Sequence, residues 1–141
     1  CDIRLGTYDL RCGLPEVKLG WPPNYGWQIL QKTLGRSKLL DLSLTGEFMD
    51  AERAMAMGLI NHITPQGDAL ATAKALAQRI AENGPMAVKV SKAIIKASRD
   101  WSDDEAFAKQ SDFTQSVFSS EDAIEGATAF AEKRKPEWKG R

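Results

Sequence analysis

The spacing of apolar residues along the chain changes from the period of strands to the period of helices. Ile3 and Leu5 alternate with polar neighbours, and a second apolar group follows at 14–17. Together they predict short strands with turns over residues 1–18. The apolar run at 59–63 stops at a proline and predicts one further strand.

Helical spacing begins after a loop, which the prolines and glycines of residues 20–26 predict. Trp27, Leu30 and Leu34 lie at i, i+3 and i+7, on one face of a helix. Further helices are expected where a capping residue, an apolar stripe and a terminating glycine or proline occur in that order. The approximate ranges are 27–34, 37–42, 51–57, 70–82, 85–97, 103–118 and 120–132.

For two of these helices the apolar spacing also predicts which face is buried. In the helix over 70–82, one stripe begins at Leu70 and continues through Ala73 to Ile80. The helix after the capping box at 102–105 fits two stripes equally well. One is Phe107, Thr114 and Phe118; the other is Ala106, Phe113 and Val117.

Strands come first and helices after, which is typical of an α+β domain or of a part of one. We expect residues 1–65 to carry the strands, the loop and short helices, and residues 66–141 to form a helical region. Strand content is low for a sheet that must be stable alone. The helical stripes therefore need a surface to pack against.

Composition narrows the class of protein. With 141 residues, 43% hydrophobic and 27% charged, the chain has the length and composition of one folded domain. Nineteen basic residues balance nineteen acidic ones, which argues against binding of nucleic acid through bulk charge. No apolar run approaches the roughly 18 residues that span a bilayer, so no membrane association is expected.

Cysteine and histidine are too few for most metal or disulfide chemistry. Two cysteines and one histidine cannot supply a disulfide framework or a histidine-based metal cluster, so no metal site is expected. His62 is interpreted as a polar position near the end of a short strand. A Ser-His-Asp triad around it lacks the G-x-S-x-G turn that exposes such a serine.

Four segments, in this order and at this spacing, resemble the enoyl-CoA hydratase/isomerase (crotonase) superfamily. They are 1–4; 13–20; 44–46 with 50–54 and 58–61; and 120–122, leading to 126 and 129–136. The resemblance covers essentially the whole chain, but only the back half of the family's usual chain. It implies an α+β fold: the C-terminal portion of the α/β spiral crotonase-like fold, with few short strands followed by a helical trimerisation region.

The resemblance places Glu16 at the family's second catalytic glutamate. In hydratases this residue exchanges a proton with the carbon alpha to the thioester, and in the related isomerases it shuttles the proton alone. A carboxyl group held against an apolar acyl chain is easier to protonate than one in water, which suits such a role. The front half of the family's chain carries the oxyanion hole and the first glutamate, so we expect this chain alone to be inactive.

The resemblance also implies residues that bind substrate. In the loop after Glu16, we expect Trp21, Pro23 and Tyr25 to contact the acyl part. This loop lacks the family's common Ile-Pro-Gly run and is one residue shorter, which leaves acyl specificity and the reaction itself open. Phe130 and Lys133 match positions that contact the coenzyme A nucleotide, commonly in a site completed by a neighbouring subunit.

The function implied is an enoyl-CoA hydratase. Alternatives within the family are a double-bond isomerase, a hydratase-lyase or a decarboxylase, and outside enzymes a truncated homologue acting as an assembly or binding module. No metal or redox cofactor is implied, because coenzyme A is part of the substrate. Expected partners are an acyl-CoA thioester, the front half in the same or a separate chain, and further copies in a homotrimer or dimer of trimers. The expected location is the cytoplasm, or the mitochondrial matrix in a eukaryote.

Overall fold

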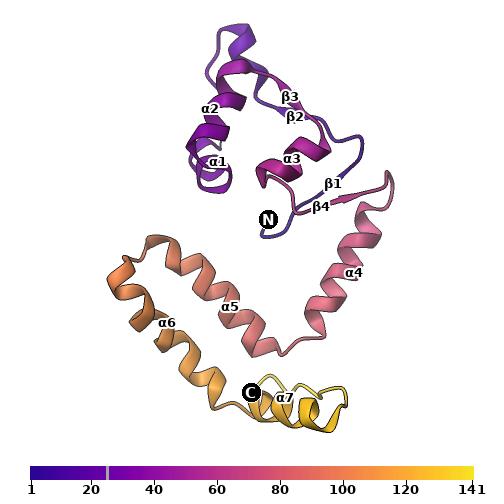
Figure 1. Ribbon diagram of the computed structural model, residues 1–141, viewed down its shortest axis with the longest axis vertical. Helices are drawn as coiled ribbons and strands as arrows, with labels where there is room; N and C mark the ends of the chain where they lie inside the picture. Colours follow the sequence, from indigo (N-terminus) through magenta and orange to yellow (C-terminus); the bar gives the residue numbers. More distant parts are fainter. Residues whose placement is uncertain (25) are drawn as a thin grey trace. The chain divides into compact units, whose positions relative to one another are not determined.

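The computed structural model describes residues 1–24 and 26–141, which form two compact units, Cys1–Ala75 and Leu76–Arg141 (Figure 1). The first unit contains β1 (Leu5–Thr7), β2 (Cys12–Gly13), η1 (Pro15–Leu19), α1 (Trp27–Leu34), α2 (Arg36–Thr45), β3 (Phe48–Met49), α3 (Ala51–Met57) and β4 (His62–Thr64). Helix α4 (Ala69–Ala81) contains the division. The second unit continues with α5 (Pro85–Ala97), η2 (Ser98–Asp100), α6 (Asp103–Phe118) and α7 (Glu121–Glu132).

The strands form two small sheets. β1 pairs in parallel with β4, with Leu5 opposite His62, and β2 pairs antiparallel with β3, with Cys12 opposite Met49. His62 is exposed on β4, as its interpretation as a polar strand residue requires. β3 is only two residues long, too short to show an alternating pattern in the sequence.

The strand expected at 14–17 is wrong, because these residues enter the 3₁₀ helix η1. Pro15 occupies the first turn, where its fixed φ and missing N–H are tolerated. Gly20, with φ 78°, closes the helix by donating its N–H to the Val17 carbonyl at 3.1 Å. The strand expected at 59–63 also starts late, since the N–H of Leu59 bonds to the Ala54 carbonyl and completes the end of α3.

The core of the first unit lies among α1, α2, β3, α3 and the approach to β4. Each element contributes apolar residues from one face, as helical spacing predicts. The buried cluster consists of Leu34, Leu42, Met49, Ala54, Met57 and Ile60. The unit is therefore held together mainly by apolar packing.

Arg4 connects the first strand to the end of α3. Its guanidinium donates hydrogen bonds to the carbonyl oxygens of Leu59 and Gly58, the latter at 3.3 Å. The Asn61 side-chain oxygen accepts from the Arg4 N–H at 2.9 Å, and the Asn61 N–H donates to the Arg4 carbonyl at 2.7 Å. A cation at a helix C-terminus complements both the unpaired carbonyls and the helix dipole. These contacts set β1 beside β4.

Gly46 brings η1 against the end of α2. Its φ of 62° is left-handed, and a Cβ at this position would lie 2.9 Å from Val17 Cγ2 and 3.1 Å from Lys18 Cγ. Next to it, the Lys18 ammonium pairs with Glu47 at 2.8 Å. Glycine is therefore required here both for its conformation and for the close approach. The contact holds the turn that carries Glu16.

In the second unit α5 and α6 lie side by side (Figure 1), and the rings of Trp101 and Phe113 are 5.8 Å apart. Phe113 is half-buried with Ala106 and Val117, whereas Phe107 and Phe118 are each 80% exposed. The second of the two stripes expected for α6 is thus the buried one.

The stripe expected for α4 is wrong at both ends. Leu70 is 67% exposed and Ile80 37%, and the half-buried residues of the helix are Ala69, Thr72, Ala73 and Leu76. These four lie at i, i+3, i+4 and i+7, so the buried face is turned away from Leu70. No helix that the structure describes has both the length and the apolar character needed to cross a membrane.

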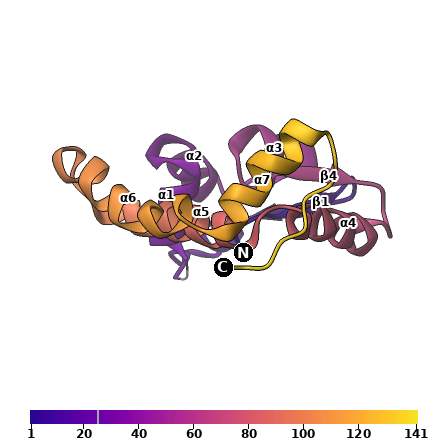
Figure 2. The same ribbon diagram turned by 90° about the horizontal axis from the view of Figure 1, so that it is seen from below.

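The C-terminal segment runs back along α7 (Figure 2). The buried carboxylate of Asp122 accepts hydrogen bonds from the N–H groups of Lys139, at 2.7 Å, and Gly140, at 2.9 Å. The Trp138 ring packs on Gly126, where a Cβ would lie 3.2 Å from the ring, and its indole N–H donates to the Glu82 carbonyl at 2.8 Å. The segment therefore ties α7 to the turn between α4 and α5.

Replacing Gly46 by Ala should destabilise the protein more than replacing Gly58 by Ala. Both glycines end a helix in the left-handed conformation, but a Cβ at Gly58 meets no atom within 4 Å. Gly58→Ala is expected to lower the free energy of unfolding by about 1–2 kcal/mol, and Gly46→Ala by roughly 1–3 kcal/mol more through overlap with Val17. Urea denaturation of both variants measures the difference, and equal losses would show that η1 does not pack tightly on α2.

Candidate functional site

Glu16 lies in the first turn of η1, between the β2–β3 sheet and the loop. Its carbonyl accepts a hydrogen bond from the Trp21 N–H at 3.1 Å, which turns the chain out of η1 into the loop. Its carboxylate oxygen Oε2 is buried and has no hydrogen-bond partner among the described residues. A buried polar oxygen without a partner is costly in a residue with a purely structural role.

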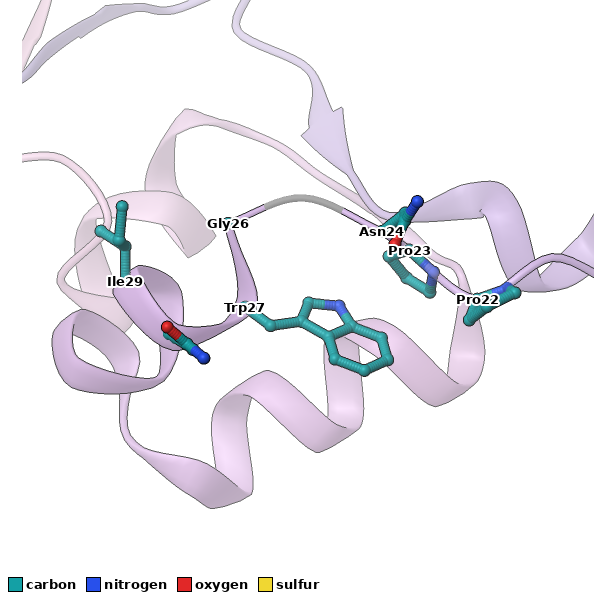
Figure 3. Close-up of a pocket in the computed structure, with 7 residues that line it drawn as sticks. Pro22, Pro23, Asn24, Gly26, Trp27 and Ile29 are labelled. Carbon is teal, nitrogen blue, oxygen red and sulfur yellow. The ribbon is translucent and has the colours of Figure 1, made fainter.

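A pocket of about 420 Å³, open to solvent on one side, lies between the loop after Glu16 and the start of α1. Pro22, Pro23, Asn24 and Trp27 are among its lining residues. Figure 3 shows the indole ring of Trp27 extending from the start of α1 toward Pro22 and Pro23. An aromatic ring facing two prolines gives this pocket a largely apolar wall.

A second pocket, of about 350 Å³, opens among η1, the loop, α1 and α2. Its apolar lining includes Val17, which follows Glu16 directly, and Pro23, which it shares with the first pocket. From α2 it takes Leu39, Leu40 and Leu44. The size and apolar lining are those of a small-molecule site.

The residues expected in the acyl site occupy different positions. Pro23 is buried and lines both pockets, whereas Trp21 is 71% exposed and lines neither. Glu16 itself is not among the lining residues; its neighbour Val17 is. Tyr25 lies outside the described residues.

Phe130 and Lys133 come together at the end of α7, in the second unit. The Phe130 ring is 87% exposed, and Lys133 is an exposed residue that ends the helix with φ 55°. Beside them, the guanidinium of Arg134 forms a bidentate pair with Glu125, at 2.5 and 2.9 Å. An exposed ring next to an ammonium can stack on a base and pair with a phosphate.

Comparison with known proteins identifies the family. A family model described as enoyl-CoA hydratase/isomerase matches residues 1–141. The chain belongs to this family. Its fold is therefore the α+β crotonase-like fold, which the solved structures of enoyl-CoA hydratases share with it.

Named relatives agree with this assignment. The chain is 38% identical over 138 residues to the short-chain-enoyl-CoA hydratase of Clostridium acetobutylicum, covering 97% of this chain and 53% of that protein. It is 39% identical over 132 residues to the carnitinyl-CoA dehydratase of Salmonella arizonae, covering 90% and 51%. A crystal structure of an enoyl-CoA hydratase from Mycobacterium tuberculosis superposes with a TM-score of 0.90 at 43% identity, covering 100% and 56%. The chain spans about half the length of the curated relatives it matches.

Metal-ligating side chains and the Cys12 thiol were also considered as candidate site residues. Among the described residues, no group of three or more His, Cys, Asp or Glu side chains is placed to hold a metal ion. Burial raises the pKa of the Cys12 thiol, which keeps it protonated and weakly nucleophilic.

The polar lining of the second pocket was missed in the sequence. It consists of Gln31, Arg36 and Ser43, from α1 and α2. Ser43 lies one helical turn after Leu39, on the face of α2 that the apolar pattern already marks as buried. A serine on an otherwise apolar helical face was therefore the sequence signal that could have indicated this polar lining. Its hydroxyl oxygen is buried and has no partner among the described residues.

Replacing Ser43 by Ala should stabilise the protein. The change removes a buried hydroxyl without a partner, and it should add about 1 kcal/mol to the free energy of unfolding beyond the gain in helix propensity. The exposed Ser91, inside α5, gives the matched control, since Ser91→Ala changes helix propensity alone. Thermal denaturation compares the two, and a loss of stability in Ser43→Ala would mean that the hydroxyl is satisfied in the folded protein.

Protonation of Glu125 should loosen the end of α7 only in strong acid. The hydrogen bonds from Arg134, followed by that from the Glu137 N–H, lower the pKa of Glu125 from 4.5 to about 2. Because the folded value is the lower one, the pair stabilises the folded state above the ordinary pKa and loses this contribution as pH falls toward 2. An NMR titration of the glutamate side chains measures this directly, and a Glu125 midpoint near 4.5 would contradict the paired geometry.

Proposed function

We propose that this chain is part of an enoyl-CoA hydratase, which adds water reversibly to the double bond of a 2-enoyl-CoA thioester. The observation that carries the proposal is the buried, partnerless Oε2 of Glu16, in a chain whose relatives include named enoyl-CoA hydratases. A group that must exchange a proton with a ligand needs an oxygen that the protein does not itself occupy.

In the proposed reaction the hydroxyl of water adds to the β carbon while a second carboxylate takes the other proton of the water, and Glu16 delivers a proton to the α carbon. In the reverse direction Glu16 removes the α proton, and the hydroxyl leaves the β carbon as water after taking a proton from the second carboxylate. Hydrogen-bond donors at the thioester oxygen stabilise the enolate-like intermediate. We propose that these donors and a second carboxylate come from a front half, supplied by the same chain or a separate one, so that this chain alone is inactive.

The proposal assigns the substrate to two surfaces. Trp21, Pro23 and Tyr25 would contact the acyl part. The role of Pro23 is supported by its buried position in the lining of both pockets. Phe130 and Lys133 would bind the coenzyme A nucleotide, which their exposure at the end of α7 supports. Coenzyme A belongs to the substrate, and the proposed reaction requires no metal or redox cofactor.

Assembly is part of the proposal. The second unit exposes large apolar side chains that a monomer would leave in water, including Phe107 and Phe118 on α6 and Ile124 on α7. We propose that they are covered in a homotrimer or a dimer of trimers. The proposed location is the cytoplasm, or the mitochondrial matrix in a eukaryote.

Two observations support other activities of the same family. The relative from Salmonella arizonae is a carnitinyl-CoA dehydratase, and the family description includes isomerases. An isomerase would use Glu16 alone to move a proton between carbons. A hydratase-lyase or decarboxylase would use the same thioester activation with a different bond broken.

Glu16→Gln should abolish hydration. We would assemble the chain with the front half of the Clostridium acetobutylicum relative and follow the loss of absorbance of the enoyl thioester. Because glutamine cannot exchange the α proton, the rate should fall by about 10²–10⁴-fold with little change in KM. Glu52→Gln, at an exposed position on α3, is the control and should be unchanged.

The outcomes separate the alternatives. A wild-type rate in Glu16→Gln would remove Glu16 from the mechanism. Movement of the double bond without hydration would identify an isomerase. An assembly that forms but turns over no thioester would favour the non-catalytic binding module.

A further inference from the structure

Helix α7 ends differently from the other helices that finish in a left-handed residue. η1, α2 and α3 end at Gly20, Gly46 and Gly58, each with positive φ. α7 ends at Lys133, with φ 55° and ψ 37°, and Lys133 is the one non-glycine residue with positive φ among those described. A side chain at this conformation crowds the backbone carbonyl, whereas glycine adopts it freely.

Hydrogen bonds on both sides of Lys133 hold it in this conformation. Its N–H donates to the Phe130 carbonyl at 3.2 Å, and the Arg134 N–H donates to the Ala129 carbonyl at 3.0 Å. The Arg134 guanidinium is fixed in turn by its bidentate pair with Glu125. Glu125 also accepts from the Glu137 N–H at 2.8 Å, which anchors the chain that follows.

The same contacts leave the Lys133 ammonium available. Arg134 pairs with both nearby carboxylates, Glu125 and Glu132, the second at 2.7 Å. Within residues 1–24 and 26–141, no carboxylate pairs with Lys133. The exposed Phe130 ring lies one helical turn before it. The end of α7 therefore presents a free cation beside a ring, at a position where glycine would be more stable.

We propose that Glu125 and Arg134 are positioning residues, which hold Lys133 in the left-handed conformation so that its ammonium meets an anionic phosphate of coenzyme A. This rests on the proposed function, in which Lys133 binds the coenzyme A nucleotide. The strained conformation at Lys133 lowers the stability of the folded chain, and it holds the ammonium at a fixed position.

Lys133→Gly tests the first half of the proposal. Glycine relieves the strain, so the unfolding temperature should rise by about 3–6 °C. It also removes the ammonium, so the affinity for coenzyme A, measured by calorimetry on the full chain, should fall about tenfold or more. Lys135→Ala removes a neighbouring exposed lysine and should change neither quantity by a comparable amount.

Glu125→Gln tests the positioning role through a double-mutant cycle. The variant keeps Lys133 but loses the bidentate pair to Arg134, so coenzyme A should bind several-fold more weakly. In the Lys133→Gly background the same change should have no further effect on affinity, because no ammonium remains to be positioned. A general loss of structure would instead weaken binding equally in both backgrounds.

Each result decides the matter. Independent effects of the two changes, or unchanged affinity in Glu125→Gln, would overturn the positioning role. Unchanged affinity in Lys133→Gly with a higher unfolding temperature would reduce Lys133 to a strained helix end. If the wild-type chain bound no coenzyme A, both the proposed nucleotide site and this inference would be wrong. If the two changes were coupled as expected but the assembled protein did not hydrate the thioester, only the proposed role of Glu16 would be wrong.

Discussion

The position of Glu16 depends on the contact between η1 and the C-terminal end of α2 at Gly46. The absence of a side chain there lets Val17 approach the helix end, and the left-handed turn at Gly46 directs the chain into β3. β3 then pairs with β2, which immediately precedes η1. The turn that carries Glu16 is therefore fixed at its beginning by a strand pair and along its length by a helix.

The two units are stabilised in different ways. In the first, six buried apolar residues form one cluster, and Arg4 closes the end of α3. In the second, the carboxylates of Asp122 and Glu125 lie one turn apart on α7 and receive backbone N–H groups of the C-terminal segment. Hydrogen bonds to charged groups are stronger than neutral ones, so a few of them, together with the packing of the half-buried Trp138 ring, can hold the segment in place.

Local signals account for the helices that the sequence predicted well. Asp50 accepts from the Arg53 N–H and begins α3, Gly58 ends it, and Pro85 opens α5. Ser120 begins α7, with its hydroxyl oxygen accepting from the Ala123 N–H. Prediction and structure agree at these helix ends, whereas at the capping box predicted for α6 the Ser102 hydroxyl donates to the Glu105 carboxylate and does not cap a backbone N–H.

Two features were not predicted because the local pattern carries no information about them. A five-residue 3₁₀ helix has no hydrophobic period, so η1 resembled a strand. The contacts of Trp138 with Gly126 and with the Glu82 carbonyl join positions that are distant in the chain. The sequence around Trp138 contains no pattern that predicts these partners. Family resemblance supplied the fold class and the expectation for Glu16, but not the left-handed conformation of Lys133, which occurs where the Lys133 and Arg134 N–H groups bond to the Phe130 and Ala129 carbonyls.

The parallel pairing of β1 with β4 has a consequence for the order of folding. It joins positions 5 and 62, so β1 can pair only after η1 and helices α1 to α3 have brought the two ends of a long loop together. Closing such a loop is entropically unfavourable before those helices form. During synthesis β1 leaves the ribosome before β4 and waits for a partner made more than fifty residues later. We therefore expect β1 to be among the last elements of its unit to reach its final pairing.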